Sequence, residues 1–169
     1  QLPMAVIVAA ARGGVRAETE QTQGLSNMTA HLLLKGTSRK SAVDIATTVE
    51  SWGGILAPFS GRDGFGLSLQ LLTEDLEQGV GLLRELLADS VVPEPELELQ
   101  RQLVLKELAS RDDDVFDVGS RLLRRTLFTH HPYRFDPMGS PDSVSRLTRA
   151  DCRRFAQERL AAGNLVVSV

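Results

Sequence analysis

Three residues, Asn27, Ala30 and His31, have the spacing of a zinc-binding helix but only part of its chemistry. Such a helix needs two histidines four residues apart and a glutamate between them. At 3.6 residues per turn, both imidazoles then share one face with the base that activates the metal-bound water. Here Asn27 replaces one histidine and Ala30 replaces the glutamate, which leaves His31. The pattern therefore predicts a non-catalytic role.

His31 is followed by three leucines and Lys35-Gly36-Thr37. This segment resembles peptidase family M16, the inverzincin family of pitrilysin, insulinase and mitochondrial processing peptidase. Its pattern reads His-x-x-Glu-His, an apolar pair and Lys-Gly-Thr. The resemblance spans nearly the whole chain, through Gly53-Gly54, residues 60–63, Val92-Pro93, His131-Pro132-Tyr133, Gly139-Ser140-Pro141 and residues 164–167.

The resemblance also implies a distal glutamate that completes the metal site of active members. Glu107, about 75 residues beyond His31, stands at that place, and a second family glutamate falls on Gln100. An amide oxygen is a poor zinc ligand, and Ala30 has no proton acceptor for the general-base step. We therefore expect no catalytic residue and no metal at the remnant positions His31 and Glu107, with a His31–Glu107 hydrogen bond if the two meet. Substrate-binding residues stay unknown.

The composition is that of one globular domain. The chain has 169 residues, 42% of them hydrophobic and 24% charged, and a net charge of −3, which argues against nucleic acid as a partner. No apolar run approaches the ~20 residues that cross a bilayer, so no membrane insertion is expected. We expect a soluble fragment without a signal segment, opening at Gln1 and truncated at both ends of a larger multi-domain protein. The compartment stays unknown.

Hydrophobic periodicity and capping residues predict an α+β fold. Residues 4–11 read as a strand with two buried faces, and residues 15–23 as a polar loop. Helices are predicted at 24–35, 41–52, 96–110, 114–128 and 148–162, with caps at Ser41 and Thr148. A further helix after the cap at Thr73 carries its apolar residues on one side, Leu76, Val80, Leu83 and Leu87. Strands are predicted at 55–60, 65–72 and 164–169, with a loop at 129–142, and alternating leucines give the strand at 65–72 one buried and one polar face. The M16 resemblance implies the same, a LuxS/MPP-like metallohydrolase half-domain with a small antiparallel-rich sheet covered on one face by helices.

Other polar clusters have two interpretations each. His130-His131 suggests a second metal site, but adjacent loop residues chelate one ion poorly, and a structural role is favoured. Asp112-Asp113-Asp114 lacks the spacing of a calcium loop and is typical of a helix cap. Cys152, the single cysteine, is expected to be a small helix residue rather than a reactive thiol.

Two arginine-containing segments are read in the same way. Arg62-Asp63 is expected to form a turn with a local ion pair. Arg121, Arg124 and Arg125 are expected on a basic helix face, solvated or, alternatively, used for docking.

Two classes of function follow from the resemblance. In the first, this domain is a pseudoenzyme that pairs, as in a heterodimer or within one long chain, with an active M16 subunit or domain. The partner holds the zinc, and the two enclose a chamber for a peptide substrate. In the second, the chain is an active zinc metalloendopeptidase with an atypical site that recruits Glu98, Glu107 or His130. A third, weaker hypothesis is a purely structural assembly module.

Overall fold

The computed structural model describes residues 3–169, and the predicted opening at Gln1 lies outside them. Four antiparallel strands form one sheet in the order β2-β3-β1-β4. β1 lies at Met4–Arg12, β2 at Ile55–Ser60, β3 at Gly64–Leu72 and β4 at Leu165–Ser168. The hairpin of β2 and β3 thus provides one edge, and the late strand β4 returns to the other.

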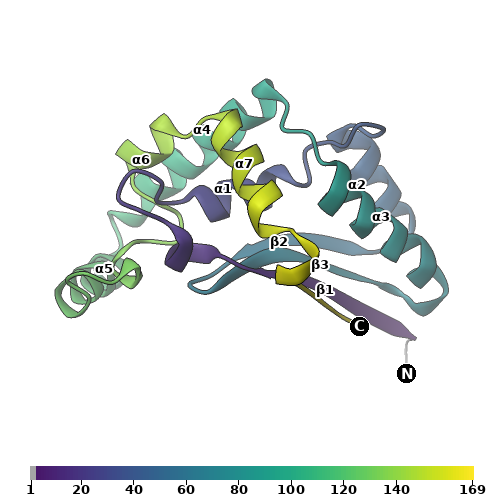
Figure 1. Ribbon diagram of the computed structural model, residues 1–169, viewed down its shortest axis with the longest axis horizontal. Helices are drawn as coiled ribbons and strands as arrows, with labels where there is room; N and C mark the ends of the chain where they lie inside the picture. Colours follow the sequence, from purple (N-terminus) through teal and green to yellow (C-terminus); the bar gives the residue numbers. More distant parts are fainter. Residues whose placement is uncertain (1–2) are drawn as a thin grey trace.

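Helices fill the rest of the chain and gather on one side of the sheet (Figure 1). The described α-helices are α1 (Leu25–Leu32), α2 (Ala42–Ser51), α3 (Leu76–Asp89), α4 (Glu94–Arg111), α5 (Val115–Leu127), α6 (Pro141–Arg146) and α7 (Arg149–Arg159). Short 3-10 turns include η1 (Gly14–Ala17) and η3 (Pro132–Arg134). This confirms the predicted α+β class with helices on one face.

The one-sided cover explains the burial along β1. Ile7 and Ala9 point to the helices and are 0% and 1% exposed, whereas Met4 and Val6 on the other face are each 47% exposed. The prediction that β1 has two buried faces was therefore wrong. The apolar run along β1 is continuous because apolar residues such as Val6 also occupy the uncovered face.

Two core clusters lie between the sheet and the helices. One surrounds α1, with Met28 and Leu32 packed among residues of α4 and α7 such as Leu97 and Phe155. The second lies under α2 and α3 and includes Leu67, Leu69 and Leu71 of β3 and Leu86 of α3. α1 is therefore held in the middle of the helical layer.

Two boundary predictions need correction. The first helix ends at Leu32 rather than residue 35, because the amides of Leu34 and Lys35 bond the carbonyls three residues back and tighten the last turn. Residues 129–142, predicted as a loop, contain η3, and Ser140 then caps the unpredicted short helix α6 through a capping box.

The face of α3 was also predicted differently. Val80 was expected on the buried side but is 47% exposed. Gly79 lies on that side instead, where an added Cβ would stand 2.3 Å from a methyl carbon of Leu71. The glycine lets α3 approach β3 closely, and this rotates Val80 outward.

Candidate functional site

The N-terminus of α1 is fixed by a buried carboxylate. Glu18 is 4% exposed, and its two oxygens accept the backbone N–H groups of Gly24 and Ser26 at 2.9 and 2.8 Å. These are N–H groups that have no partner within the helix. Burial raises the pKa of Glu18 to about 7, although the two backbone hydrogen bonds act in the opposite direction.

Sequence reasoning missed Glu18 because residues 15–23 were read as a polar loop. A single acidic residue just before a helix is a common N-terminal feature, and only the fold of η1 brings this one under α1. Glu18 therefore positions the helix that carries the remnant motif.

The three motif positions on α1 lie as the helical spacing predicts, but their surroundings differ. Asn27 and His31 are both partly exposed. Ala30 is 0% exposed and belongs to the core around α1. The position of the general base is therefore part of the packed interior.

α4 brings the distal position close to α1. Glu107 is exposed and Gln100 is 6% exposed. Burial lowers the pKa of His31, the charge of Lys35 lowers it further, and the charge of Glu107 raises it. His31 and Glu107 thus interact electrostatically, but the described residues contain no hydrogen bond or ion pair between them. The hydrogen bond expected if the two side chains met is therefore not formed.

The donor set does not fit a catalytic zinc ion. Such a site needs three good ligands and an open position, whereas His31 and Glu107 provide two and Asn27 adds an amide. Within residues 3–169, no group of three or more His, Cys, Asp or Glu side chains is arranged to hold a metal ion. The neutral imidazole that the lowered pKa of His31 favours is therefore a ligand without a complete site.

The Lys35-Gly36-Thr37 segment ties α1 to α3. The Thr37 hydroxyl donates to Glu85 at 2.6 Å, and the Lys40 ammonium donates to the other oxygen of the same carboxylate at 2.6 Å. The amides of Arg39 and Lys40 donate to the Thr37 hydroxyl. These charged and hydroxyl hydrogen bonds lower the pKa of Glu85. The segment has a structural role here.

His131-Pro132-Tyr133 anchors the β2–β3 turn. The Tyr133 hydroxyl lies 2.7 Å from both oxygens of Asp63, and Arg62 donates to the Tyr133 carbonyl at 3.1 Å. His131 Nδ1 accepts the amide of Tyr133, which supports the structural role expected for this histidine. The predicted local Arg62–Asp63 ion pair is wrong, because both side chains reach across to residue 133.

An arginine network holds α5 against the body. Arg111 donates to Asp117 and Asp136, and Arg124 lies 3.6 Å from Asp136. The Arg111 guanidinium lowers the pKa of Asp117. Arg121 contacts Asp117 at 3.0 Å as well. The expected solvated basic face is therefore wrong for Arg121 and Arg124, since acidic side chains occupy the positions beside them.

The remaining candidates behave as structural residues. Asp114 caps α5 by accepting the amides of residues 116 and 117, as predicted. Cys152 is 0% exposed, and burial raises its pKa to about 12, which matches the unreactive interpretation. His130 is exposed on the surface.

The observation that decides the family is a match along most of the sequence. The family model described as Insulinase (Peptidase family M16) matches residues 4–139. The chain belongs to peptidase family M16. An uncharacterized zinc protease of Mycobacterium leprae is 33% identical over 156 residues, covering 92% of this chain and 35% of that protein. Subunit 1 of the bovine mitochondrial cytochrome b-c1 complex is 28% identical over 155 residues, covering 92% and 32%.

Solved structures agree on the M16 fold. The peptidase M16 inactive domain from Pseudomonas fluorescens superposes with a TM-score of 0.92 at 23% identity, over 99% of this chain and 41% of that one. The periplasmic protease PqqL of Escherichia coli gives 0.89 at 19% identity, over 98% and 19%. The chain thus spans about a third of the length of the curated relatives it matches.

None of the helices within residues 3–169 combines the length and apolar character needed to span a bilayer.

Proposed function

We propose that this M16 domain is non-catalytic and pairs with an active M16 zinc-peptidase domain or subunit, whose zinc performs the chemistry. In this pair the domain forms part of the wall of a peptide-binding chamber. It belongs, as a single domain, to a larger multi-domain protein or assembly.

One observation carries the non-catalytic part. The helix that carries the motif positions is held in place, because Glu18 caps α1 and Thr37, just beyond α1, bonds Glu85 of α3. The positions that would bind zinc and move a proton instead hold Asn27 and Ala30. A buried methyl group at position 30 cannot accept a proton from water.

The surface of α5 supports the pairing. We call its outward side the α5 apolar face, and its exposed residues include Val115 (81%), Phe116 (89%), Leu122 (65%), Leu123 (58%) and Leu127 (66%). Figure 1 shows α5 at the margin of the molecule, set apart from the main helical layer. Its polar side is used by the arginine network, so the apolar side is left for another surface. Clustered exposed apolar side chains of this kind are typical of protein interfaces.

The test of pairing uses an M16 peptidase with an intact His-x-x-Glu-His motif encoded in the same reading frame or beside this domain. Sedimentation velocity measures complex formation, and cleavage of a fluorogenic peptide measures activity, with and without this domain. We expect a complex and a higher cleavage rate when both are present. Phe116→Glu with Leu122→Glu should abolish the complex.

The matched control is Val43→Glu on α2, where the side chain is 72% exposed but lies outside the α5 apolar face. This variant should pair normally. A peptidase that reached full activity alone and formed no complex with this domain would overturn the proposal.

A second candidate function is a structural assembly module without peptide contact. The match to subunit 1 of the cytochrome b-c1 complex favours it, because that name describes a subunit of a complex. In the same assay, a complex whose cleavage rate equals that of the peptidase alone would support this candidate.

A further inference from the structure

Within residues 3–169, the helices cover one face of the sheet and leave the other open (Figure 1). We call the second one the open sheet face. It is formed by every second residue of 4–10 in β1, 55–59 in β2, 66–72 in β3 and 166–168 in β4. Antiparallel sheets that are covered on one side usually carry polar residues on the other. Here the exposed side chains include Met4 (47%), Val6 (47%), Ile55 (62%) and Val166 (67%). The open sheet face is therefore apolar where polar residues are expected.

The open sheet face also lacks charge over most of its area. In the four described strands, Arg12 at the end of β1 is the only charged residue at an outward position. A contiguous set of exposed apolar side chains is typical of a binding surface. A charged group buried against this surface would lose its hydration and find no partner. The occupant that fits the open sheet face is therefore uncharged.

Polar groups lie along β3, an inner strand of the sheet. Gln70 is opposite Val6 in β1 and Ile55 in β2, and Ser68 is the next outward residue of β3. Gln70 Nε2 lies 4.0 Å from the sulfur of Met4, which is a weak acceptor, so the amide keeps its capacity to bind another group. Hydrogen-bonding groups thus stand between two apolar rows. This order matches an extended peptide, whose backbone carries N–H and C=O groups and whose side chains project to both sides.

A small residue lies between larger ones at the other end of the open sheet face. Phe59 is opposite Gly66, and a Cβ at Gly66 would stand 3.0 Å from Cζ of the Phe59 ring, so the ring lies over the glycine. Ala10 is the neighbour of Gly66 in β1, and Val166 follows in β4. Ala10 thus leaves room for an apolar side chain of the occupant between the Phe59 ring and Val166.

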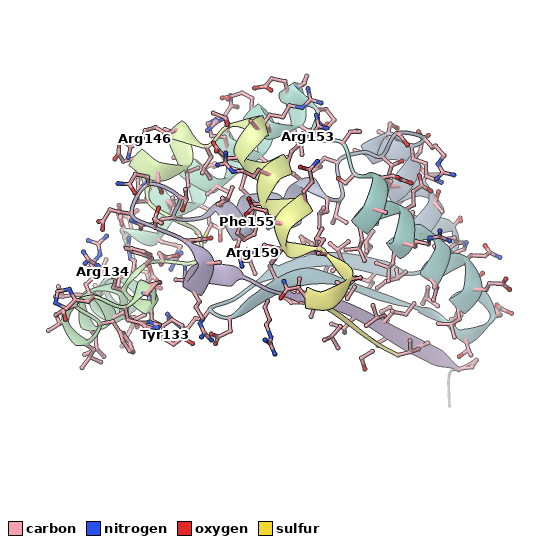
Figure 2. The ribbon with its side chains drawn as sticks, in the orientation of Figure 1. Tyr133, Arg134, Arg146, Arg153, Phe155 and Arg159 are labelled. Atoms are coloured by element: carbon pink, nitrogen blue, oxygen red, sulfur yellow. The ribbon has the colours of Figure 1, made fainter. Side chains whose placement is uncertain are left out.

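The β2–β3 turn connects the open sheet face with α5. The Tyr133 hydroxyl lies 2.7 Å from Asp63 in this turn, and the Tyr133 ring packs edge-on against Phe128 with the ring centres 5.6 Å apart. Phe128 directly follows α5. Figure 2 shows Tyr133 beside α5, at the end of the sheet. A partner on the α5 apolar face would therefore border the open sheet face, and a peptide on that face would lie beside the partner.

We propose that the open sheet face binds extended peptide segments with uncharged, apolar side chains. Ser68 and Gln70 bind the peptide backbone, and the rows that contain Ile55 and Val6 take side chains on either side. The inference rests on the proposed function for the role of this peptide, since it names the class of substrate that the chamber wall accepts. Binding itself requires neither zinc nor the partner.

The test is fluorescence anisotropy of a coumarin-labelled, uncharged peptide amide, Gln-Val-Ser-Leu-Ser-Val-Gln, titrated with the chain. Two further peptides carry Glu or Lys in place of the central Leu. We expect saturable binding of the neutral peptide and binding at least about tenfold weaker for both charged peptides, because these lose the burial of one apolar side chain. No binding of the neutral peptide, or equal binding of all three, would overturn the proposal.

Val6→Lys should change which peptide is bound. We expect it to weaken binding of the neutral peptide about tenfold and to bind the Glu peptide more tightly than the wild type does, because the new cation faces the acidic side chain. A gain for the Glu peptide is not produced by a loss of folding. Ile55→Lys gives a second test from β2 and should behave in the same way. Val43→Lys is the matched control on α2, where Val43 is 72% exposed, and it should bind as the wild type does. Unchanged binding in both variants of the open sheet face would contradict the proposal.

Sedimentation velocity of the chain alone tests the other occupant of this face, a second copy of the chain. We expect a monomer at the concentrations of the binding assay. A dimer that Val6→Lys dissociates and Val43→Lys does not would assign the face to self-association and overturn the peptide proposal. Binding of the neutral peptide without complex formation with the M16 peptidase would overturn only the proposed function. Complex formation without peptide binding would overturn only this inference.

Discussion

The remnant zinc positions and the segments that hold them in place differ in how their polar groups are satisfied. In the segments around the site, Thr37 shares Glu85 with Lys40, and Tyr133 contacts Asp63, 70 residues away in the sequence. At the remnant site, the charge of Glu107 raises the pKa of His31, but no hydrogen bond among the described residues joins the two side chains. The segments that hold α1 in place are joined by hydrogen bonds, whereas the remnant zinc positions are not. The proposed non-catalytic role requires only the first of these two regions.

The largest effect is expected when the missing base is restored at position 30. Ala30→Glu places a carboxylate at a position with no exposed surface. An uncompensated buried charge should lower the free energy of unfolding by about 3 kcal/mol or more. Urea denaturation of wild type and variant measures this loss. Ala30→Gln is the uncharged control of the same size, and equal losses in the two variants would show that the charge is not what destabilises the site.

The second prediction concerns the cap of α1. Because the pKa of Glu18 is raised from 4.5 to about 7 by burial, the folded state binds its proton more tightly than the unfolded state does. The contribution of Glu18 to the free energy of unfolding is therefore fully present below pH ~4.5 and is lost as the pH rises towards 7. The loss is on the order of 3 kcal/mol. Glu18→Gln should remove this slope from a pH series of urea denaturations. A slope unchanged in Glu18→Gln would contradict the assignment.

The arginine network should give an intermediate effect. Arg111→Gln leaves Asp136 and Asp117 without their main cation, and we expect a loss of about 2 kcal/mol in the free energy of unfolding. Arg125→Gln, at an exposed arginine of α5, should change the free energy of unfolding by less than about 0.5 kcal/mol. A similar loss in both variants would mean that the network does not hold α5.

The smallest effect is expected at the β2–β3 turn. Tyr133→Phe removes the hydroxyl that reaches Asp63 and keeps the ring. Thermal unfolding should report a loss of about 1 kcal/mol. Asp63→Asn, which keeps an acceptor for the hydroxyl, should cost less, and the reverse order would contradict this contact.

Much of the fold could be predicted from local signals. Ser41 and Thr148 were recognised as caps, and the alternation of leucines in β3 gave its buried face. The short helix α6 was missed because six residues between turn signals carry too little periodicity to detect.

The site was predictable only as a set of residue types. The spacing of Asn27, Ala30 and His31 placed them correctly on one helix, but their burial depends on what packs above it. The orientation of α5 could not be predicted for a related reason. Periodicity reveals an apolar stripe, but which way the stripe faces depends on the ion pairs of the polar side, among them Arg111 with Asp117 and Arg124 with Asp136.

The most direct test of the central claim is a zinc titration of the wild type and of Asn27→His, followed by inductively coupled plasma mass spectrometry after desalting. Asn27→His supplies a third good donor beside His31 and Glu107 and leaves the buried Ala30 unchanged. We expect no stoichiometric zinc in the wild type, about one equivalent in the variant, and no peptide cleavage by either. A wild type that retained one equivalent of zinc and cleaved peptides in a chelator-sensitive manner would contradict the account.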